Sequence, residues 1–259
     1  MQRELNSPGF PNGIKMKHVM RVALIVLTAM LAGPTPAHGA DLLSLYMSEI
    51  PGQTMQNEDE PGTALEIVRV AAKHTGFKLN EAFVPWTRAV AKTAKDANAI
   101  IIPFARTPKR ERNYTWIMEL YSLQFGFVSL DMPVNDKAAA RRLKRVGVWR
   151  GSSMEEELQS DGFKNLNAVS NDRALTRMLV AGRLQAWYGS LSEAAYMFRG
   201  IEQINRRRIR FGTPTKSIRI WLAGGLEMPK ATVERLRNAV QTMHDNGTVQ
   251  SIIERYGIN

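Results

Sequence analysis

The chain contains the run Ile100-Ile101-Ile102-Pro103-Phe104-Ala105-Arg106-Thr107-Pro108-Lys109-Arg110-Glu111-Arg112, in which an apolar stretch opens into a turn rich in guanidinium groups. A short, continuous apolar run is typical of a strand buried on both faces of a parallel sheet. Residues just beyond the carboxyl end of such a strand face the crevice in which α/β proteins bind ligands. An arginine there can hold a carboxylate with two parallel hydrogen bonds. A solvated basic turn, paired with Glu111 and Glu119, explains the same residues without a ligand, so both interpretations stay open at this point.

Outward from this run, strand-like segments alternate with amphipathic helical segments over residues 41–259. This alternation is the pattern of an α/β protein with a largely parallel sheet. We expect strands over residues 42–46, 77–84, 98–104, 123–130, 146–149, 163–169, 184–188, 208–211 and 217–223. We expect helices over residues 63–76, 85–95 and 138–145, from residue 152, and over 171–181, 190–198, 229–244 and 249–256. Capping boxes predict the start of three helices, at Thr63/Glu66, at Ser152/Glu155 or Ser153/Glu156, and at Ser190/Glu193.

The first forty residues differ in character from the rest of the chain. Lys15, Lys17 and Arg21 precede an apolar stretch over residues 22–33, and small residues follow near residues 37–40. The apolar stretch is too short for a membrane span, which needs roughly twenty residues, and the order of these features is that of a secretory signal peptide. We therefore predict a signal peptide over residues 1–39 and a periplasmic mature protein. Met16 is an alternative start, in which case residues 1–15 are not translated.

The composition excludes several classes of protein and site. Hydrophobic residues make up 44% of the chain and charged residues 23%, which is typical of a globular protein and not of a disordered one. Cysteine is absent, which excludes disulfides, thiolate nucleophiles, cysteine-ligated metals and a lipid-modified cysteine. Without residues 1–39 the formal charge is +8. The basic clusters at residues 141–145 and 206–210 are interpreted as a solvated helix end and strand start, with no motif for nucleic acid.

The common enzyme and cofactor motifs are also missing. The chain contains no G-x-S-x-G, H-E-x-x-H or G-x-x-x-x-G-K-S/T pattern, and no G-x-G-x-x-G follows a predicted strand. Beyond the signal region the only histidines are His74 and His244, each near the end of a predicted helix, where a cation is stabilised by the helix dipole. We therefore predict no metal site and no cofactor.

Six segments occur in a recognisable order along the mature chain. They are PGTALEIV (61–68), VPWTRA (84–89), RTPKRE (106–111), VGVWRGSS (146–153), GRLQAW (182–187) and NGTVQSIIERYG (246–257). Together they resemble the type-3 family of bacterial extracellular solute-binding proteins, the polar amino-acid receptors of ABC importers, over nearly all of residues 41–259. The resemblance implies a two-lobed α/β fold of the type II periplasmic binding proteins, with a largely parallel sheet flanked by helices in each lobe and two hinge crossings. We expect lobe 1 over residues 40–131, lobe 2 over 132–213 and the return to lobe 1 over 214–259.

The resemblance also implies a site and partners. Arg110 would grip the ligand carboxylate, and Ser152 and Ser153 would supply hydroxyl and amide donors from a helix start, which is an anion site in its own right. The expected walls of the site are Trp86, Trp149 and the residues from Tyr46 to Glu49. The implied function is that of a receptor, not an enzyme, which binds a small anionic solute and delivers it to the membrane permease of an ABC importer. We expect a monomer without a nucleic-acid partner.

Two positions depart from the family pattern. Amino-acid receptors of this family have an aspartate, which pairs with the ligand ammonium, where this chain has Ser190. Pro103 and Ala105 replace the hydroxyl-bearing residues that precede the arginine of the grip. We therefore expect a small organic anion, of aromatic or apolar character, in place of a standard α-amino acid. An amino-acid-like carboxylate is the alternative. Ser190 is equally explained as a helix N-cap.

Two other functions are compatible with the sequence. Some relatives of this fold are periplasmic dehydratases that act on cyclic carboxylates, and such chemistry needs an acid or base in the cleft. Glu49 is the candidate for that role. The chain is also compatible with a ligand-binding partner of a sensor or of another periplasmic enzyme.

Overall fold

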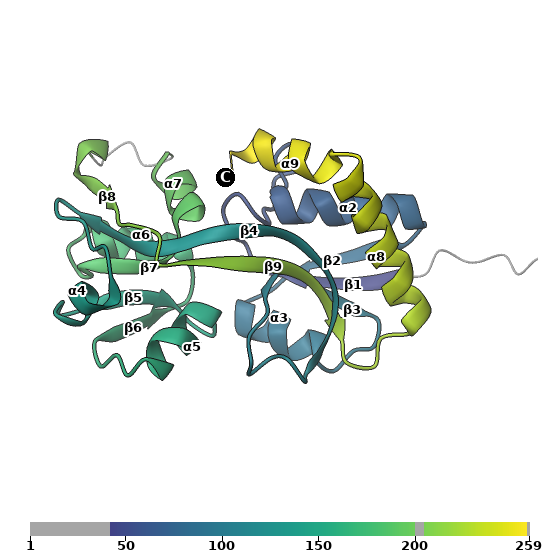
Figure 1. The fold of residues 1–259 in the computed structure, drawn as a ribbon, viewed down its shortest axis with the longest axis horizontal. Coiled ribbons are helices and arrows are strands. Elements are labelled where there is room, and N and C mark those ends of the chain that lie inside the picture. Colours follow the sequence, from purple (N-terminus) through teal and green to yellow (C-terminus); the bar gives the residue numbers. More distant parts are fainter. Residues whose placement is uncertain (1–41, 200–204, 258–259) are drawn as a thin grey trace, which may run out of the picture. The chain divides into compact units, whose positions relative to one another are not determined.

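The computed structural model describes residues 42–199 and 205–257, all within the compact unit formed by residues 40–259 (Figure 1). The signal peptide predicted over residues 1–39 lies outside the described residues. In lobe 1 the elements are β1 (Leu42–Met47), α2 (Thr63–Thr75), β2 (Lys78–Phe83), α3 (Trp86–Thr93), β3 (Ala99–Ala105), α8 (Lys230–Asp245) and α9 (Thr248–Tyr256). In lobe 2 they are α4 (Lys137–Arg141), β5 (Val146–Trp149), α5 (Ser153–Ser160), β6 (Leu166–Val169), α6 (Asp172–Val180), β7 (Ala186–Ser190), α7 (Leu191–Arg199), η1 (Arg206–Arg208) and β8 (Ile209–Phe211). The long strands β4 (Tyr114–Leu130) and β9 (Lys216–Gly225) belong to both lobes.

The strand pairing divides the sheet into two parallel groups. The strand order is β2-β1-β3-β9-β4-β7-β5-β6, and β8 pairs with β4. In lobe 1, β1 runs parallel to β2 and β3, and in lobe 2, β5 runs parallel to β6 and β7. Strands β9 and β4 join the two groups through antiparallel pairs. The predicted arrangement of two α/β lobes, each with a group of parallel strands, is therefore present in the described residues, and the antiparallel strands β4, β8 and β9 make the whole sheet mixed.

Strand β4 is longer than the sequence predicts. It has 17 residues and pairs with β9 from Tyr114 to Phe125, and from Phe125 to Ser129 it also pairs with β7. Two register shifts interrupt its pairing with β9 near Trp116 and Glu119. Such bulges break the alternation of buried and exposed residues, which explains why only residues 123–130 carry a strand pattern. The chain therefore joins the sheet of lobe 2 by Phe125, before the connector expected from residue 131.

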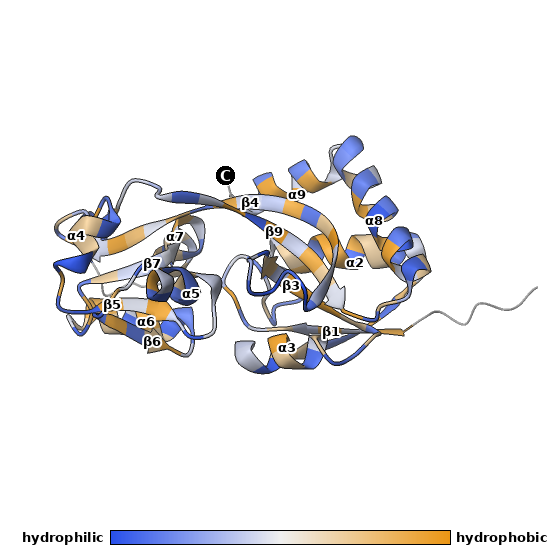
Figure 2. Cartoon of the chain, turned by 60° about the horizontal axis from the view of Figure 1, so that its bottom comes forward, coloured by the Kyte–Doolittle hydropathy of each residue, from blue (hydrophilic) through white to orange (hydrophobic). Residues whose placement is uncertain are grey.

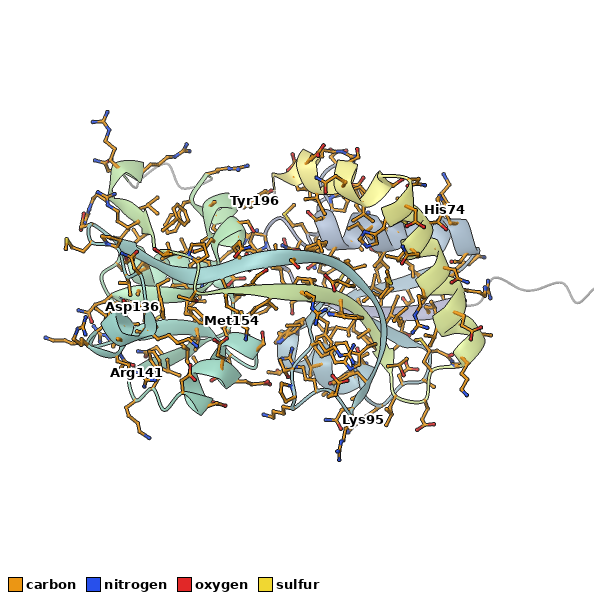
Figure 3. All side chains as sticks on the ribbon, in the orientation of Figure 1. His74, Lys95, Asp136, Arg141, Met154 and Tyr196 are labelled. Carbon is orange, nitrogen blue, oxygen red and sulfur yellow. The ribbon has the colours of Figure 1, made fainter. Side chains whose placement is uncertain are left out.

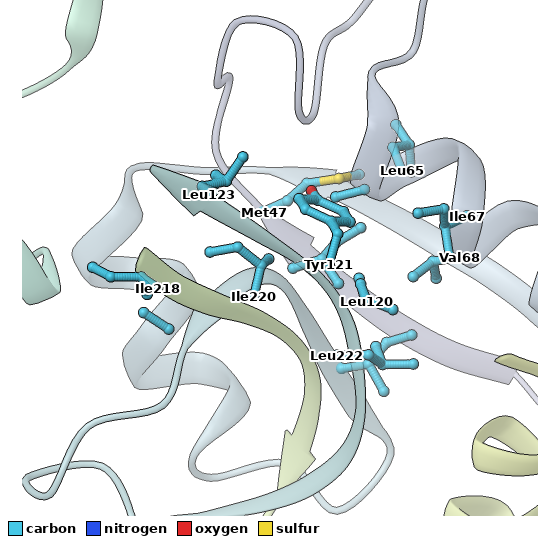
Figure 4. Packing of buried hydrophobic residues seen from close by; sticks show 14 of the residues in the cluster. Met47, Leu65, Ile67, Val68, Leu120, Tyr121, Leu123, Ile218, Ile220 and Leu222 are labelled. Carbon is cyan, nitrogen blue, oxygen red and sulfur yellow. The ribbon is translucent and has the colours of Figure 1, made fainter. Parts of the chain in front are cut away.

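A core of aliphatic side chains joins the helices of lobe 1 to the sheet (Figure 4). Leu65, Ile67 and Val68 of α2 are fully buried, because this helix lies between the sheet and helices α8 and α9. The polar faces of α8 and α9 are directed outward, and the ribbon colours in Figure 2 show this amphipathic pattern. None of the described helices is long and apolar enough to span a membrane.

The start of α2 differs from the predicted capping box. Thr63 is the first helical residue and its hydroxyl donates to the carbonyl of Gly52, while Glu66 accepts from Tyr256 Oη at 2.9 Å. The first amides of the helix donate instead to the carbonyls of Gly52 and Gln53, in the loop after β1. Tertiary contacts therefore satisfy the groups that a side-chain cap satisfies in an isolated helix.

We expect Gly62→Ala to destabilise the protein by roughly 3 kcal/mol or more, because Gly62 has φ 94° and ψ 156° and an added Cβ would lie 2.4 Å from the carbonyl carbon of Gln53. The matched control is Gly76→Ala, which also requires a positive φ of 75° but has no atom within 4 Å of the added Cβ. The control should cost about 1 kcal/mol. Urea unfolding measures both values, and equal costs would contradict the steric argument.

Candidate functional site

Arg110 lies in a turn that follows the buried strand β3. The turn is held by the amides of Arg110 and Glu111, which both donate to the carbonyl of Thr107 at 3.0 and 2.9 Å. All seven residues of β3 are buried, so the strand gives this turn a rigid base. The turn directs the Arg110 side chain inward, and the residue is only 4% exposed. A solvated basic turn, the alternative explanation of this segment, therefore does not describe Arg110.

The guanidinium of Arg110 reaches from lobe 1 to lobe 2. Its Nη1 donates to the carbonyl of Ala105 at 3.1 Å, and its Nη2 donates to the carbonyl of Gly151, which follows β5, at 3.1 Å. Nη2 also lies 3.6 Å from Oε1 of Glu156 on α5. Burial lowers the pKa of Arg110, and the nearby carboxylate of Glu156 partly offsets this effect. The guanidinium stays charged at neutral pH because it is a very weak acid.

A second side chain of lobe 1 binds the same carbonyl of lobe 2. Trp86, the first residue of α3, donates from Nε1 to the carbonyl of Gly151 at 3.0 Å. The ring of Trp86 lies 5.2 Å from that of Trp149 and 5.9 Å from that of Phe104, between ring centroids. The guanidinium carbon of Arg110 lies 4.6 Å from the centroid of Phe104. The guanidinium thus lies over the face of one aromatic ring, in a cation–π arrangement.

These side chains line a cavity of about 40 Å³ between the two lobes. That volume holds about one water molecule, whose share of liquid water is about 30 Å³. The lining comes from both lobes and from both long strands, and Figure 3 labels one of its members on α5, Met154. The lining residues are Ile50, Trp86, Pro103, Ala105, Arg110, Phe125, Trp149, Ser152, Ser153, Met154, Glu193 and Ile220. Five of the eight residues predicted from the sequence are among them.

The start of α5 contributes two of the predicted residues, Ser152 and Ser153. Ser152 caps the helix by accepting from the amide of Glu155 at 3.2 Å, and the amide of Gly151 donates to Oε2 of Glu155 at 2.6 Å. Of the two overlapping boxes, the structure thus uses Ser152 with Glu155. Ser153 donates to the sulfur of its neighbour Met154 at 3.4 Å. Because Glu155 occupies one of the free amides, fewer donors remain at this helix start for an anion than the sequence suggests.

The other three predicted residues lie outside this lining. Ser190 is fully buried at the end of β7, where its Oγ accepts from the amide of Glu193 at 3.3 Å, so it acts as a helix cap. Glu49 lies in a separate outer groove, where its Oε1 is 3.7 Å from Nη2 of Arg173. The ring of Tyr46 faces Lys92 of α3, with Nζ 4.8 Å from its centroid. The described residues contain no cluster of three or more side chains suited to a metal ion.

Comparison with known proteins identifies the fold of this chain. No protein-family model and no curated protein matches this sequence. Solved structures do match over most of both chains. An ABC uptake transporter substrate-binding protein from Streptococcus pneumoniae with bound histidine has a TM-score of 0.74, 13% identity, and coverage of 83% of this chain and 92% of that one. The fold is that of the type II periplasmic binding proteins.

Two further matches show how widely this periplasmic-binding fold is used. A histidine kinase sensor domain with similarity to periplasmic binding proteins has a TM-score of 0.76 and 15% identity, with coverage of 84% of this chain and 96% of that one. An ancestral amino-acid-binding protein, a precursor of cyclohexadienyl dehydratase, has a TM-score of 0.70 and 13% identity, with coverage of 83% and 94%. At these identities the likeness concerns the fold, and a receptor, a sensor and a precursor of an enzyme all share it.

The periplasmic-binding fold brings two carboxyl groups together that the sequence does not single out. Glu193 of α7 lines the cavity and is 7% exposed, and Asp172 at the start of α6 is 3% exposed. Oδ2 of Asp172 has no hydrogen-bond partner among the described residues. Burial raises the pKa of Asp172 to about 7, and burial together with the charge of Asp172 raises the pKa of Glu193 well above its usual value.

These two groups could not be found by sequence motif. Glu193 matches the last position of a capping box and Asp172 follows the N-cap residue Asn171, so each has an ordinary local explanation. Their burial depends on the packing of α6 against α7, which is a tertiary property. The carboxyl of Glu193 also raises the pKa of Tyr121 on β4, whose own burial is the larger cause. The cavity is therefore cationic at Arg110 and acidic at Glu193.

Proposed function

We propose that this protein is a solute receptor of the kind that serves ABC importers, and that it binds a small carboxylate between its lobes. The observation that carries the proposal is the Arg110 guanidinium, which is almost completely buried between the lobes and lines the cavity there. A buried guanidinium is a strong and directional site for a carboxylate, because two of its N–H groups match the two carboxylate oxygens. The matched substrate-binding protein of an ABC uptake transporter supports the proposed role in transport.

The proposal requires the lobes to separate when the ligand binds. A cavity of about 40 Å³ holds about one water molecule, and an amino acid has several times as many heavy atoms. Separation breaks the hydrogen bonds from Trp86 and Arg110 to the carbonyl of Gly151 and frees donors on the guanidinium. The long strands β4 and β9 connect the lobes, and bending of these strands provides the hinge.

Glu193 favours a ligand with a cationic group beside its carboxylate. The sequence favours a plain organic anion, because Ser190 carries no charge at the position where amino-acid receptors have aspartate. Glu193 supplies a carboxyl group on the same cavity, three residues later, and its side chain has no hydrogen-bond partner among the described residues. A ligand ammonium stabilises the ionised form of this group, whereas a second ligand carboxylate destabilises that form and is repelled by Glu156. We therefore propose an amino-acid-like zwitterion as the ligand class.

The enzymatic alternative lacks its proposed acid. Glu49 lies in the outer groove beside Arg173 and is not among the residues that line the cavity. Sensor and transport roles share the same binding step, so both follow from the same proposed site.

We expect residues 40–259 to bind at least one amino acid with a saturable rise in melting temperature and a change in tryptophan fluorescence, because Trp86 and Trp149 line the cavity. The panel should contain amino acids, simple monocarboxylates and dicarboxylates. Glu193→Gln should weaken binding of the amino acid at least tenfold and leave monocarboxylates unchanged.

The matched control is Glu49→Gln, which removes a carboxylate from the outer groove and should leave both affinities unchanged. Tighter binding of dicarboxylates than of amino acids would contradict the role of Glu193. A panel without any binding carboxylate would contradict the receptor itself. Conversion of a bound ligand into a product would support the enzymatic alternative.

A further inference from the structure

Two basic clusters that are far apart in the sequence lie at one end of lobe 2. Residues 141–145 directly precede β5, and residues 206–208 directly precede β8. The strands of lobe 2 follow one another across the sheet in the order β5, β7, β4 and β8. The residues at this end are paired from strand to strand, in the order Val146, Ala186, Ser129 and Arg210. Three steps of strand spacing separate the two outer strands, which is about 14 Å. Figure 1 shows α4 and β8 at this same end, and Figure 3 labels Arg141 there.

We name this end of lobe 2 the distal face. It lies at the amino ends of β5 and β7, whereas the cavity lies at their carboxyl ends. Gly151 follows the carboxyl end of β5 and Ser190 is the last residue of β7, whereas Arg145 and Gln185 precede the amino ends of these strands. The amide of Gln185 donates to the carbonyl of Arg145 at 3.0 Å, which joins the two strand starts. Residues 126–215 carry 15 of the lysines and arginines against 9 acidic residues, so most of the excess positive charge of the mature chain is in this lobe.

The distal face carries basic side chains that the protein itself does not neutralise. Six of them are exposed and make no ion pair or side-chain hydrogen bond with any residue that the structure describes. The acids nearby are already engaged: Asp131 binds Arg208 at 2.7 Å, and Asp161 binds Lys137 at 2.7 Å. The six unpaired side chains are Arg142, Lys144, Arg145, Lys164, Arg183 and Arg207.

Two large apolar side chains are exposed where β4 and β8 pair. Met132 is 75% exposed in the turn after β4, and Phe211 is 44% exposed at the end of β8. The turn at Met132 is held in place, because the amide of Asp131 donates to the carbonyl of Arg208 at 2.6 Å and Asp131 has a positive φ of 66°. A fixed methionine beside unpaired cations is suited to a surface that is anionic outside and apolar just beneath.

We propose that the distal face docks on a lipid bilayer that contains anionic phospholipids. The cations attract the lipid phosphates, and Met132 and Phe211 enter the boundary between head groups and acyl chains. An acidic protein would satisfy the cations equally well, but the highly exposed Met132 is better matched by an apolar layer that its side chain can enter. In this orientation the cavity faces away from the bilayer, so docking and ligand binding are independent of one another.

The test is co-sedimentation of residues 40–259 with vesicles, at low and at high salt. We expect binding to vesicles of phosphatidylglycerol mixed with phosphatidylcholine, little binding to pure phosphatidylcholine, and loss of binding at high salt. The triple variant Arg142→Gln, Lys144→Gln, Arg145→Gln should bind on the order of 100-fold more weakly, about fivefold for each cation. Met132→Ser should weaken binding several-fold without changing its salt dependence.

The matched control removes three exposed lysines of lobe 1 with no ion pair among the described residues, as Lys73→Gln, Lys78→Gln, Lys95→Gln. Its vesicle binding should stay within about twofold of the unsubstituted protein, because these lysines lie outside the distal face. The two triple variants lose the same net charge, so they differ only in the position of the lost charge. Equal loss in the two triple variants, or equal binding to both kinds of vesicle, would overturn the proposal. Retention on a polyglutamate resin without vesicle binding would overturn it in favour of an acidic protein partner.

Discussion

Arg110→Met should abolish the ligand-induced change in tryptophan fluorescence while the fold persists. Methionine keeps an apolar chain against the ring of Phe104, so the loss is that of the charged head and its two donated hydrogen bonds. Removing one partner of a buried ion pair costs roughly 3–5 kcal/mol, which corresponds to a loss of affinity of about 100- to 4,000-fold. Fluorescence titration with the ligand identified in the panel measures this change.

Arg112→Met is the matched control for this prediction. Arg112 belongs to the same turn but is exposed and has no ion pair with any described residue, so its loss should leave affinity within about twofold. Arg110→Lys keeps the charge without the planar pair of donors and should fall between the two variants. Circular dichroism establishes that each variant is folded. Full affinity in folded Arg110→Met would remove the basis for a carboxylate grip.

The second large effect concerns the stability of the protein as a function of pH. Asp172 is buried without a basic partner among the described residues, and its pKa in the folded protein is raised from 3.8 to about 7. Between these two values the unfolded chain has released the proton and the folded protein still holds it. The folded state therefore binds more protons, and this group makes the free energy of unfolding fall as the pH rises from about 4 to 7.

Asp172→Asn removes this dependence while keeping the shape of the side chain. We expect the variant to match the parent protein near pH 4 and to exceed it above pH 7 by up to a few kcal/mol, since each unit of pKa shift corresponds to about 1.4 kcal/mol. Urea unfolding across this pH range measures the difference. Asp59→Asn, at an exposed position, should leave the parent curve unchanged. A variant less stable than the parent above pH 7 would contradict the burial of an unpaired charge.

Much of the fold follows from local patterns in the sequence. The apolar run before Arg110 forms a fully buried strand, and the polar turns before α5 and α6 carry N-caps at Ser152 and Asn171. These features depend on a few neighbouring residues, so their physical causes are visible in the chain itself. The Thr63/Glu66 box failed for a different reason, since carbonyls of the preceding loop, at Gly52 and Gln53, satisfy the first amides of α2 through tertiary contacts.

The arrangement of the site was only partly predictable. The position of Arg110 follows from strand β3 and its turn, and the aromatic lining follows from segments that resemble the receptor family. The acidic side of the cavity does not, because Asp172 and Glu193 meet only when α6 packs against α7. The distal face also depends on tertiary structure and could not be predicted from the sequence. Its two basic clusters are separated by more than sixty residues of chain and become neighbours through sheet register.

One backbone oxygen, that of Gly151, already receives the hydrogen bonds of both Trp86 and Arg110. In the proposed receptor, this carbonyl competes with the ligand carboxylate for the guanidinium of Arg110. Ligand binding forms contacts with the guanidinium and breaks its hydrogen bond to the carbonyl. The free energy of binding therefore reflects only the difference between the two sets of contacts. Weak acceptors such as alcohols or ketones gain almost nothing by that exchange, and a fully ionised carboxylate gains the most. In the proposed receptor, the competing carbonyl therefore makes binding selective against neutral solutes.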